Sequence, residues 1–388
     1  MTRLILAGGG HAHLSVLERL AQNRSTGGAT GIEATLITPS AFQNYSGMLP
    51  GWIAGHYTLA ECRIDLRPLA AAAGVRLILD SVAGMDAGRH TLILASGLAM
   101  AYDLLSLDVG SETDTGGFEA LGGRLLPMKP LDDFFARWPQ LLAQAQQTRD
   151  YRLVVVGGGA AGVEIALAAR HAFGQAGIDG RVDLVASASG LLPGHAAGVV
   201  RRAQRCLVTA GIVLHHARAS GETDGIALDH GTPPGTPPYP RLPAHAVIAA
   251  TGARPLGWLG SSGLGLDANG YVAVDAQHRS MSHPQVFAAG DTCARQDVRM
   301  ARSGVHAVHA GPVLAHNLLA TIAGEPLCSY PPRPRSLYLL ATGPRRAIAS
   351  WGPWSAEGRW VWRWKDRIDR SFIRRFSPEA ATSGSCFD

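Results

Sequence analysis

Two glycine-rich turns stand where the sequence could hold a phosphate-bearing ligand. The first follows a short apolar run at residues 4–7 and places Gly8 and Gly10 before a helical pattern, but His13 stands where a third glycine is expected. The second follows a strand pattern at residues 151–156 and is complete. Its three glycines are Gly157, Gly159 and Gly162. A glycine turn between a strand and a helix lets backbone N–H groups and the helix dipole hold a pyrophosphate, so the chain is predicted to contain two dinucleotide-binding units.

Neither turn is followed by the acidic residue that usually binds a ribose hydroxyl. The strand predicted over residues 33–37 ends at Thr38, and the strand predicted over residues 181–185 ends at Ala186. An acid at the second position would bind the 2′-hydroxyl of NAD and repel the 2′-phosphate of NADP. Its absence leaves NADH and NADPH both open, with Arg201 and Arg202 as candidates to bind a 2′-phosphate.

The composition limits the class of protein. The chain has 388 residues, 46% of them hydrophobic and 17% charged, so it can bury large cores in two to three domains. Its five cysteines are scattered without a C-x-x-C pair, which argues against a disulfide framework and fits a reducing cytosol. We expect no metal site. Without a signal-peptide pattern or a run of about 20 apolar residues, we expect a cytoplasmic protein that is soluble or lies on the inner face of the cytoplasmic membrane.

Two short motifs follow the second glycine turn. A strand predicted over residues 246–250 runs into Gly252, and a later strand ends at Gly290 and Asp291 before a helix predicted over residues 304–323. Either motif alone says little, but their order and spacing after two glycine turns are informative.

With these motifs the sequence resembles the two-dinucleotide-binding-domain flavoproteins, the pyridine nucleotide-disulfide oxidoreductases, over residues 1 to about 325. Because it has no redox cysteine pair, it is more similar to type II NADH:quinone dehydrogenases and sulfide:quinone reductases than to the disulfide reductases. The stretches at residues 8–13 and 45–51 and the arginine-rich tryptophan tail most resemble a module found fused ahead of selenophosphate synthetase.

The resemblance implies an α/β fold of two Rossmann-like dinucleotide-binding domains, each with three layers of the ββα type, and a C-terminal amphipathic tail. We expect an FAD-binding domain in two parts, residues 1–115 and 251–330, with an NAD(P)H-binding domain at residues 116–250 between them. Residues 331–388 are expected to form a hairpin and a basic, tryptophan-rich amphipathic helix.

The resemblance also implies which residues bind FAD and NADH or NADPH. Gly8 and Gly10 would cradle the FAD pyrophosphate, and Asp291 would accept a hydrogen bond from the ribityl chain. The second glycine turn would hold the NAD(P)H pyrophosphate. The full cofactor-binding set is Gly8, Gly10, His11, His13, Thr38, Ser46, Gly47, Pro50, Gly110, Gly157, Gly159, Gly162, Gly252, Gly290, Asp291 and Val305. His11 and His13 could touch a phosphate or the flavin ring, but a histidine at a helix start is more often a packing residue.

Three residues are candidates for catalysis. Glu164 matches a glutamate that lies near the nicotinamide and flavin in type II dehydrogenases, although a solvated acid at a helix start is the simpler interpretation. His306 and His309, near the start of the helix over residues 304–323, could relay protons to a quinone near neutral pH.

The residues and the resemblance together predict an FAD-dependent NAD(P)H oxidoreductase that reduces a quinone-like or small chalcogen acceptor. One alternative is a sulfide or selenide:quinone reductase, which needs a thiol near the flavin; Cys293 and Cys328 are candidates, although inert buried thiols explain both. Another is a non-catalytic flavin-binding interaction module. A homodimer and a functional link to selenophosphate synthetase are further expectations.

The C-terminal tail combines tryptophan and arginine. Apolar residues recur every four positions, at Trp360, Trp364, Ile368, Phe372 and Phe376, which predicts one apolar stripe on a helix. Six arginines and one lysine between Arg359 and Arg375 outnumber two aspartates, for a net charge of +5. Such a helix at residues 360–376 could lie in a membrane interface or pack on the protein's own sheet or a dimer partner. We expect no nucleic-acid binding, because no other basic patch supports it.

Overall fold

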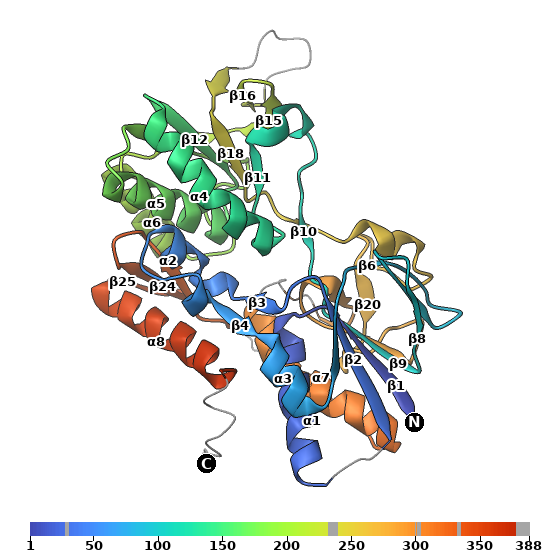
Figure 1. The fold of residues 1–388 in the computed structure, drawn as a ribbon. Coiled ribbons are helices and arrows are strands. Elements are labelled where there is room, and N and C mark those ends of the chain that lie inside the picture. The colour runs from blue at the N-terminus through green and yellow to red at the C-terminus, as the bar shows by residue number, and fades with distance from the viewer. Residues whose placement is uncertain (28–30, 232–239, 299, 301–303, 332–334, 378–388) are drawn as a thin grey trace.

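The computed structural model describes residues 1–27, 31–231, 240–298, 300, 304–331 and 335–377 (Figure 1). Two parallel sheets form the two halves of the molecule, and a C-terminal unit lies against both. In the described part of the chain, no helix is both long and apolar enough to span a bilayer.

The first sheet contains five parallel strands in the order β21-β9-β1-β2-β5. These are β1 (Thr2–Ala7), β2 (Ile32–Thr38), β5 (Arg76–Leu79), β9 (Leu104–Leu107) and β21 (Val286–Ala288). Four strands come from the first 107 residues, whereas β21 returns from much later in the chain. The sheet therefore joins two segments that are distant in the sequence, and this arrangement agrees with an interrupted domain.

Alternation along β1 divides the core of this half between two layers. Leu4 and Leu6 pack on the side of three helices, while Ile5 and Ala7 face a small antiparallel sheet. The helices are α1 (His11–Ser25), α3 (Leu66–Ala73) and α7 (Gly304–Ala323), and the antiparallel strands are β6 (Val82–Asp86), β7 (Thr91–Leu94) and β8 (Ala99–Ala101). All four β1 residues are at most 2% exposed, as expected for a parallel strand covered on both faces.

The second half repeats this three-layer plan. Its parallel sheet has the order β11-β18-β12-β13-β14. The strands are β11 (Leu125–Pro127), β12 (Tyr151–Val156), β13 (Gly180–Ala186), β14 (Val213–His216) and β18 (Ala246–Ala249). One face carries α4 (Leu131–Gln147), α5 (Ala160–Gln175) and α6 (Ala197–Thr209); the other carries antiparallel β15 (Arg218–Glu222), β16 (Gly225–Asp229) and β17 (Arg241–Pro243). The predicted pair of three-layer α/β units is confirmed.

Three further pairs of short strands complete the sheets, two of them antiparallel and one parallel. Strands β10 (Glu112–Thr113) and β19 (Ala253–Arg254) pair where the chain passes from the first sheet to the second and back. Strands β3 (Phe42–Asn44) and β4 (Arg63–Asp65) pair on either side of the short helix α2 (Leu49–Ile53). In the first half, β20 (Val272–Val274) pairs in parallel with β22 (Cys293–Arg295).

The C-terminal unit is a three-stranded antiparallel sheet followed by a helix, rather than the expected hairpin and helix. Its strands are β23 (Tyr338–Ala341), β24 (Ala347–Trp351) and β25 (Trp354–Gly358), and α8 (Arg359–Arg375) follows directly. Leu340, Ile348 and Val361 belong to the same buried cluster as the helices of the second sheet. The unit is therefore part of the core and lies beside α2 in Figure 1.

The prediction of one apolar stripe along α8 is wrong. Trp360 and Ile368 are 52% and 42% exposed, whereas Phe376 is 3% exposed in the core of the first half. A residue repeated every four positions moves around a 3.6-residue helix by about 40° at each repeat, so such a series cannot keep to one face. The buried residues within the helix are instead Val361, Trp362, Lys365 and Asp369.

Candidate functional site

A cavity of about 510 Å³ lies at the carboxyl ends of the first sheet, where ligands bind in open parallel sheets. It brings together half of the residues expected to bind cofactor. These are Gly8, Gly10, His11, Thr38, Ser46, Gly110, Gly290 and Asp291. They come from five separate segments of the chain, and the fold assembles them because parallel strands end at the same edge.

The first glycine turn fits tightly over the end of β9. Gly8 takes φ of +98°, and a side chain there would collide with the backbone of Asp108. A side chain at Gly10 would collide with the Asp108 carboxylate. Both glycines therefore let the turn lie close to β9 while the start of α1 faces the cavity.

Asp108 lines the cavity and was missed by sequence reasoning. Its Oδ2 accepts hydrogen bonds from the backbone N–H groups of Ala12, at 2.8 Å, and His13, at 3.1 Å. Burial raises the pKa of this carboxyl to about 7; the two hydrogen bonds oppose the shift, and nearby Asp291 adds to it. Because this carboxyl is partly protonated at pH 7, it repels a second anion in the same cavity less than a full carboxylate would.

His13 fills the place of the third glycine without lining the cavity. Its Nδ1 lies 2.6 Å from the carbonyl oxygen of Gly8, and its Nε2 lies 2.8 Å from Oγ of Ser106. The side chain is 1% exposed, and burial lowers its pKa to about 4. His13 therefore braces the glycine turn against β9, in the packing role that the sequence left open. Neighbouring His11 does line the cavity, and burial lowers its pKa to about 4.

A lysine from the second half enters the cavity. Lys129 Nζ lies 2.5 Å from Oδ2 of Asp291 and donates a hydrogen bond to Oγ of Ser111 at 3.0 Å. Lys129 follows β11, whereas Asp291 follows β21, so the pair joins the two halves. Nothing in the local sequence around Lys129 indicated this position.

An acid does lie near the expected ribose position, but it comes from a neighbouring strand. Asp80, at the end of β5, lines the cavity together with Thr38, Pro39 and Ser40 at the end of β2. Because β5 lies beside β2 in the sheet, the fold supplies from the adjacent strand what the sequence of β2 lacks.

The first turn of α7 also faces the cavity. Gly304 and Ala307 line it, whereas Val305, His306 and His309 are outside the lining set. His306 is buried, and its Nδ1 has no hydrogen-bond partner within the described residues. Burial lowers the pKa of His306, which favours the neutral ring. The roles predicted for these three residues remain predictions.

A buried cluster of charges lies beyond the loop at residues 45–51. Lys365 Nζ donates to the Gly47 carbonyl at 2.7 Å and pairs with Oδ2 of Asp369 at 2.9 Å. Tyr45 donates to the other Asp369 oxygen at 3.2 Å. We call Glu164, Lys365, Asp369 and Tyr45 the charged cluster. Gly47 therefore contributes its carbonyl to this cluster instead of lining the cavity.

Glu164 reaches the charged cluster from α5 and is not a solvated acid. Its Oε1 accepts a hydrogen bond from the N–H of Ala341 in β23, at 2.7 Å. Burial raises its pKa to about 7, while Lys365 and this hydrogen bond oppose the shift. Burial lowers the pKa of Lys365, but the carboxylates of Asp369 and Glu164 raise it more, so the lysine stays charged.

The charged cluster lies next to the cavity through aromatic contacts. The ring of Tyr45 lies 5.6 Å from that of His11 and stacks on Phe372 of α8 at 4.7 Å. Because His11 lines the cavity, this contact connects the cavity wall to the charged cluster. Pro50, in α2, is buried outside the lining set.

The second glycine turn has the geometry of a phosphate cradle. Gly157 takes φ of +134°, and a side chain there would strike Ala250 of the neighbouring strand end; one at Gly162 would strike the Gly157 carbonyl. A side chain at Gly159 would meet nothing within 4 Å. The start of α5 is thus open beside Gly159, as an incoming pyrophosphate requires.

Two residues predicted near the nucleotides lie elsewhere. Gly252 accepts a backbone hydrogen bond from Asp114 at the crossing between the halves, at 3.0 Å, and does not line the cavity. Arg202 pairs with Glu357 of β25 at 3.5 Å, so it is committed to the C-terminal unit rather than waiting for a 2′-phosphate.

None of the described cysteines lines the cavity. Cys293 is buried with its sulfur 3.7 Å from the Gly290 carbonyl, as expected for an inert thiol. Cys328 is exposed, so its interpretation as a buried thiol is wrong. Cys386 lies outside the described residues. No group of three or more His, Cys, Asp or Glu side chains in the described chain could hold a metal ion.

Solved structures share this fold over almost the whole chain. The sulfide:quinone oxidoreductase from the hyperthermophilic bacterium Aquifex aeolicus is 16% identical, with a TM-score of 0.79, covering 97% of this chain and 91% of that one. NDH2 from Plasmodium falciparum, solved with NADH, is 12% identical, with a TM-score of 0.80 and coverage of 96% and 98%. The water-forming NADH oxidase from Lactobacillus brevis, bound to NADH, is 18% identical, with a TM-score of 0.72 and coverage of 91% and 75%.

At these identities the likeness establishes the fold alone. No curated protein sequence matches the chain. The model of one family does match, over residues 2–316, which include both glycine turns, the cavity and all of α5. The chain therefore belongs to the pyridine nucleotide-disulphide oxidoreductase family.

Proposed function

We propose that this protein is an FAD-dependent NAD(P)H oxidoreductase that reduces a quinone-like or small chalcogen acceptor. The observation that carries the proposal is the cavity itself, which is formed by the first glycine turn, the first turn of α7 and Asp291. The open second glycine turn at Gly159 supplies a separate place for the nicotinamide nucleotide. Family membership supports the same pair of cofactors.

The residues of the cavity fit FAD in charge and shape. The start of α1 and the Gly8–Gly10 backbone would hold the pyrophosphate, and Asp291 would orient the ribityl chain. Lys129 and the start of α7 would place positive charge where reduced flavin is negative. Bound FAD would supply the hydride chemistry, accepting hydride from the nicotinamide and passing electrons to the acceptor. The chain would position the two cofactors and exclude water from them.

The charged cluster supports proton delivery to the acceptor. Glu164, with a pKa raised to about 7 by burial, can hold or release a proton near neutral pH. Reducing a quinone consumes protons as well as electrons, and the contact from His11 to Tyr45 connects this cluster to the cavity wall. We assign Glu164 to this role and keep His306 and His309 as predicted relay residues.

The thiol-dependent alternative is less well supported. A sulfide or selenide:quinone reductase of the kind predicted needs a cysteine near the flavin, and none of Cys62, Cys206, Cys293 and Cys328 lines the cavity. Cys293→Ser should therefore leave turnover with NAD(P)H unchanged, whereas loss of turnover would support the alternative. The homodimer and the link to selenophosphate synthetase remain predictions from the resemblance.

Contact with a membrane surface is also proposed for α8. Trp351, Trp354, Trp360 and Trp364 are between 37% and 54% exposed on β24, β25 and α8, although one side of α8 is packed in the core. Interfacial helices expose aromatic rings among arginines in this way. Replacing Trp360 and Trp364 by Ser should abolish binding to vesicles that contain phosphatidylglycerol; unchanged binding would contradict the proposal.

A single experiment tests the oxidoreductase assignment. The purified protein should be yellow, with flavin absorption, and NADH or NADPH should bleach it in the absence of oxygen. A quinone added afterwards should restore the colour. Protein that is colourless and takes up no FAD would refute the assignment, whereas a yellow protein that neither nucleotide bleaches would indicate a non-catalytic flavin-binding module.

A further inference from the structure

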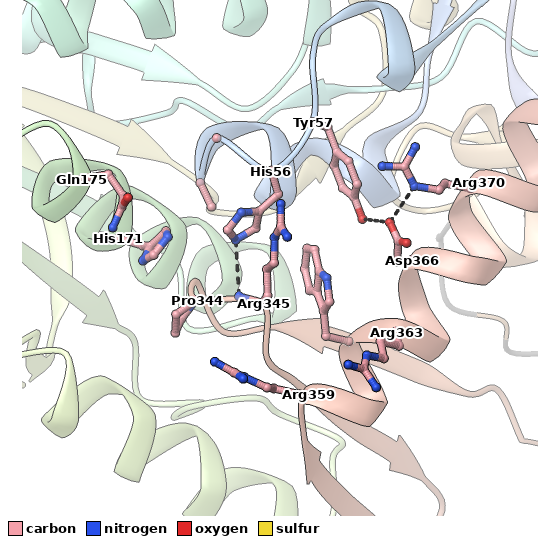
Figure 2. A pocket seen from close by; sticks show the side chains of 13 residues that line it. His56, Tyr57, His171, Gln175, Pro344, Arg345, Arg359, Arg363, Asp366 and Arg370 are labelled. Carbon is pink, nitrogen blue, oxygen red and sulfur yellow. Dashed lines mark hydrogen bonds and ion pairs between the residues drawn. The ribbon is translucent and has the colours of Figure 1, made fainter.

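A second cavity, of about 800 Å³, lies between α8, the end of α5 and the segment that follows α2, apart from the cavity at the carboxyl ends of the first sheet. Figure 2 shows its walls: the segment after α2, the end of α5, the turn between β23 and β24, and one face of α8. The two cavities share no lining residue. We call it the arginine cavity because four arginines line it: Arg345, Arg359, Arg363 and Arg370.

One of the four arginines is fully neutralised by neighbours. Arg370 pairs with Asp366 at 2.9 Å and with Glu61 at 2.8 Å. Asp366 also accepts a hydrogen bond from Tyr57 at 2.7 Å and, among the described residues, is the one acid that lines the arginine cavity. The one acid of the lining is thus already paired with Arg370 and does not neutralise the other arginines.

The other three arginines have no acidic partner within the described residues. Arg345, Arg359 and Arg363 are exposed, and no carboxylate of the described chain pairs with them. Burial lowers the pKa of His56 and His171, so both rings favour the neutral form and the guanidinium groups carry the charge. Three positive groups held around one concavity repel one another unless an anion lies between them.

The fold directs these arginines toward one space. Arg359, Arg363, Asp366 and Arg370 follow the helical repeat along one face of α8, which is fixed because the helix buries Val361 and Lys365 on another face. Arg345 comes from the opposite wall, where its backbone N–H donates a hydrogen bond to Nε2 of His56 at 3.3 Å (Figure 2).

Arg345 also has an unusual backbone. Its φ is 50°, a left-handed conformation that glycine or asparagine adopts far more readily than arginine. The turn lies directly on α5, because a side chain at Gly343 would come within 2.9 Å of the Leu167 carbonyl oxygen.

We propose that the arginine cavity binds a small phosphate-bearing anion through Arg345, Arg359 and Arg363. Planar guanidinium groups bind phosphate oxygens in pairs, and a cavity of this volume accepts a group larger than one inorganic ion. Trp362 also lines the cavity, but it is only 6% exposed, with its ring 5.1 Å from that of His56 between centres. The phosphate comes either from a soluble compound or from a lipid headgroup.

The test compares two double variants of α8 that lose the same charge. The first, Arg359→Gln with Arg363→Gln, removes two arginines that line the cavity. The control, Arg367→Gln with Arg374→Gln, removes two exposed arginines of the same helix that do not line the cavity. Arg345→Gln is the independent variant from the opposite wall. All are exposed positions, and thermal unfolding of the FAD-loaded proteins verifies that they stay folded.

The soluble probe is inorganic tripolyphosphate, measured by calorimetry on the FAD-loaded protein at two salt concentrations. Phosphate binding at the glycine turns is common to every variant, so the difference between variants reports the arginine cavity. Each lost guanidinium should weaken binding by roughly tenfold or more. The second probe is vesicles with and without phosphatidic acid, for the headgroup source.

Each outcome decides the proposal. Tripolyphosphate binding that is weakened in both cavity variants and kept in the Arg367/Arg374 control identifies a soluble ligand. Vesicle binding that depends on the cavity arginines but not on the control pair identifies a headgroup. If both double variants lose binding equally, the arginines act only as general surface charge. If neither loses binding, the probes do not bind through these arginines. Either result overturns the proposal.

Discussion

Asp108 should make FAD binding depend on pH. Its carboxyl is 4% exposed at the start of α1, in the cavity where the FAD pyrophosphate is proposed to bind, and burial raises its pKa from 3.8 to about 7. When Asp108 is protonated, it carries no charge that would repel the FAD pyrophosphate at the start of α1. When it is ionised, its negative charge opposes pyrophosphate binding. Affinity should therefore be highest below about pH 6 and fall as the pH rises through 7.

The magnitude follows from linkage. When only the protonated form accepts the cofactor, the dissociation constant rises by up to about tenfold for each pH unit above the pKa, so about tenfold at pH 8. Asp108→Asn keeps an oxygen to accept from Ala12 and His13 but stays neutral. The variant and the wild type should bind FAD equally at pH 5.5 and differ by about tenfold at pH 8.

The same shift affects stability in the apo-protein. Because the folded pKa of Asp108 lies above that of an unfolded aspartate, its contribution to stability is complete below about pH 4 and is lost as the pH rises through 7, by up to about 4 kcal/mol. Asp108→Asn should remove this loss.

Quenching of FAD fluorescence on titration with apo-protein, from pH 5.5 to 8.5, is the measurement. Asp132→Asn is the matched control, since it removes one acid from the same cavity at a position away from the α1 start. His11, with a pKa of about 4, does not titrate in this range. A wild-type affinity that is flat with pH, or an equal slope in Asp108→Asn, would refute the reasoning.

Three further predictions test other parts of the structure. Gly159→Val should fold normally, because a side chain there meets open space, but it should abolish bleaching of the flavin by NADH or NADPH while FAD stays bound. Gly162→Val should instead lower the melting temperature, because its side chain strikes the Gly157 carbonyl. Glu164→Gln keeps an acceptor for Ala341 and should remove a pH dependence near 7 from the steady-state reduction of quinone; an unchanged pH profile would count against its role in proton delivery. Lys365→Met leaves the buried Asp369 carboxyl without a cation and should cost on the order of 3–5 kcal/mol in chemical unfolding at pH 8, whereas the exposed Arg367→Met should cost less than about 0.5 kcal/mol.

The sequence predicted the architecture well because its strongest signals are local. A glycine turn between a strand and a helix is readable from a dozen residues, so the starts of α1 and α5 could be anticipated, whereas the three-layer plan of both halves was implied by the resemblance. The acid at the end of β5 could not, because recognising Asp80 as a cavity residue requires knowing that β5 lies beside β2. The position of Lys129 in the cavity could not be predicted for the same reason, since its partner Asp291 is 162 residues away in the sequence.

The charged cluster shows the other limit of pattern reasoning. Lys365 and Asp369 read as surface charges in an arginine-rich helix, and a four-residue repeat of aromatic residues suggested the wrong buried face. Which face of α8 is buried depends on where Gly47 and Glu164 lie, and both are far away in the sequence. Burial of a charge is decided by the groups that compensate it, and a local pattern does not contain them.

The packing of α8 has a mechanical consequence. Trp362 and Val361 are in the core of the second half, and Phe376 at the other end is in the core of the first, where Arg375 also pairs with Glu18 at 2.6 Å. Both ends of α8 are therefore anchored, one in each half, and moving the helix away from the body of the protein would break contacts with both. If a membrane surface rests on its exposed tryptophans as proposed, that surface would keep one orientation relative to the cavity at the carboxyl ends of the first sheet.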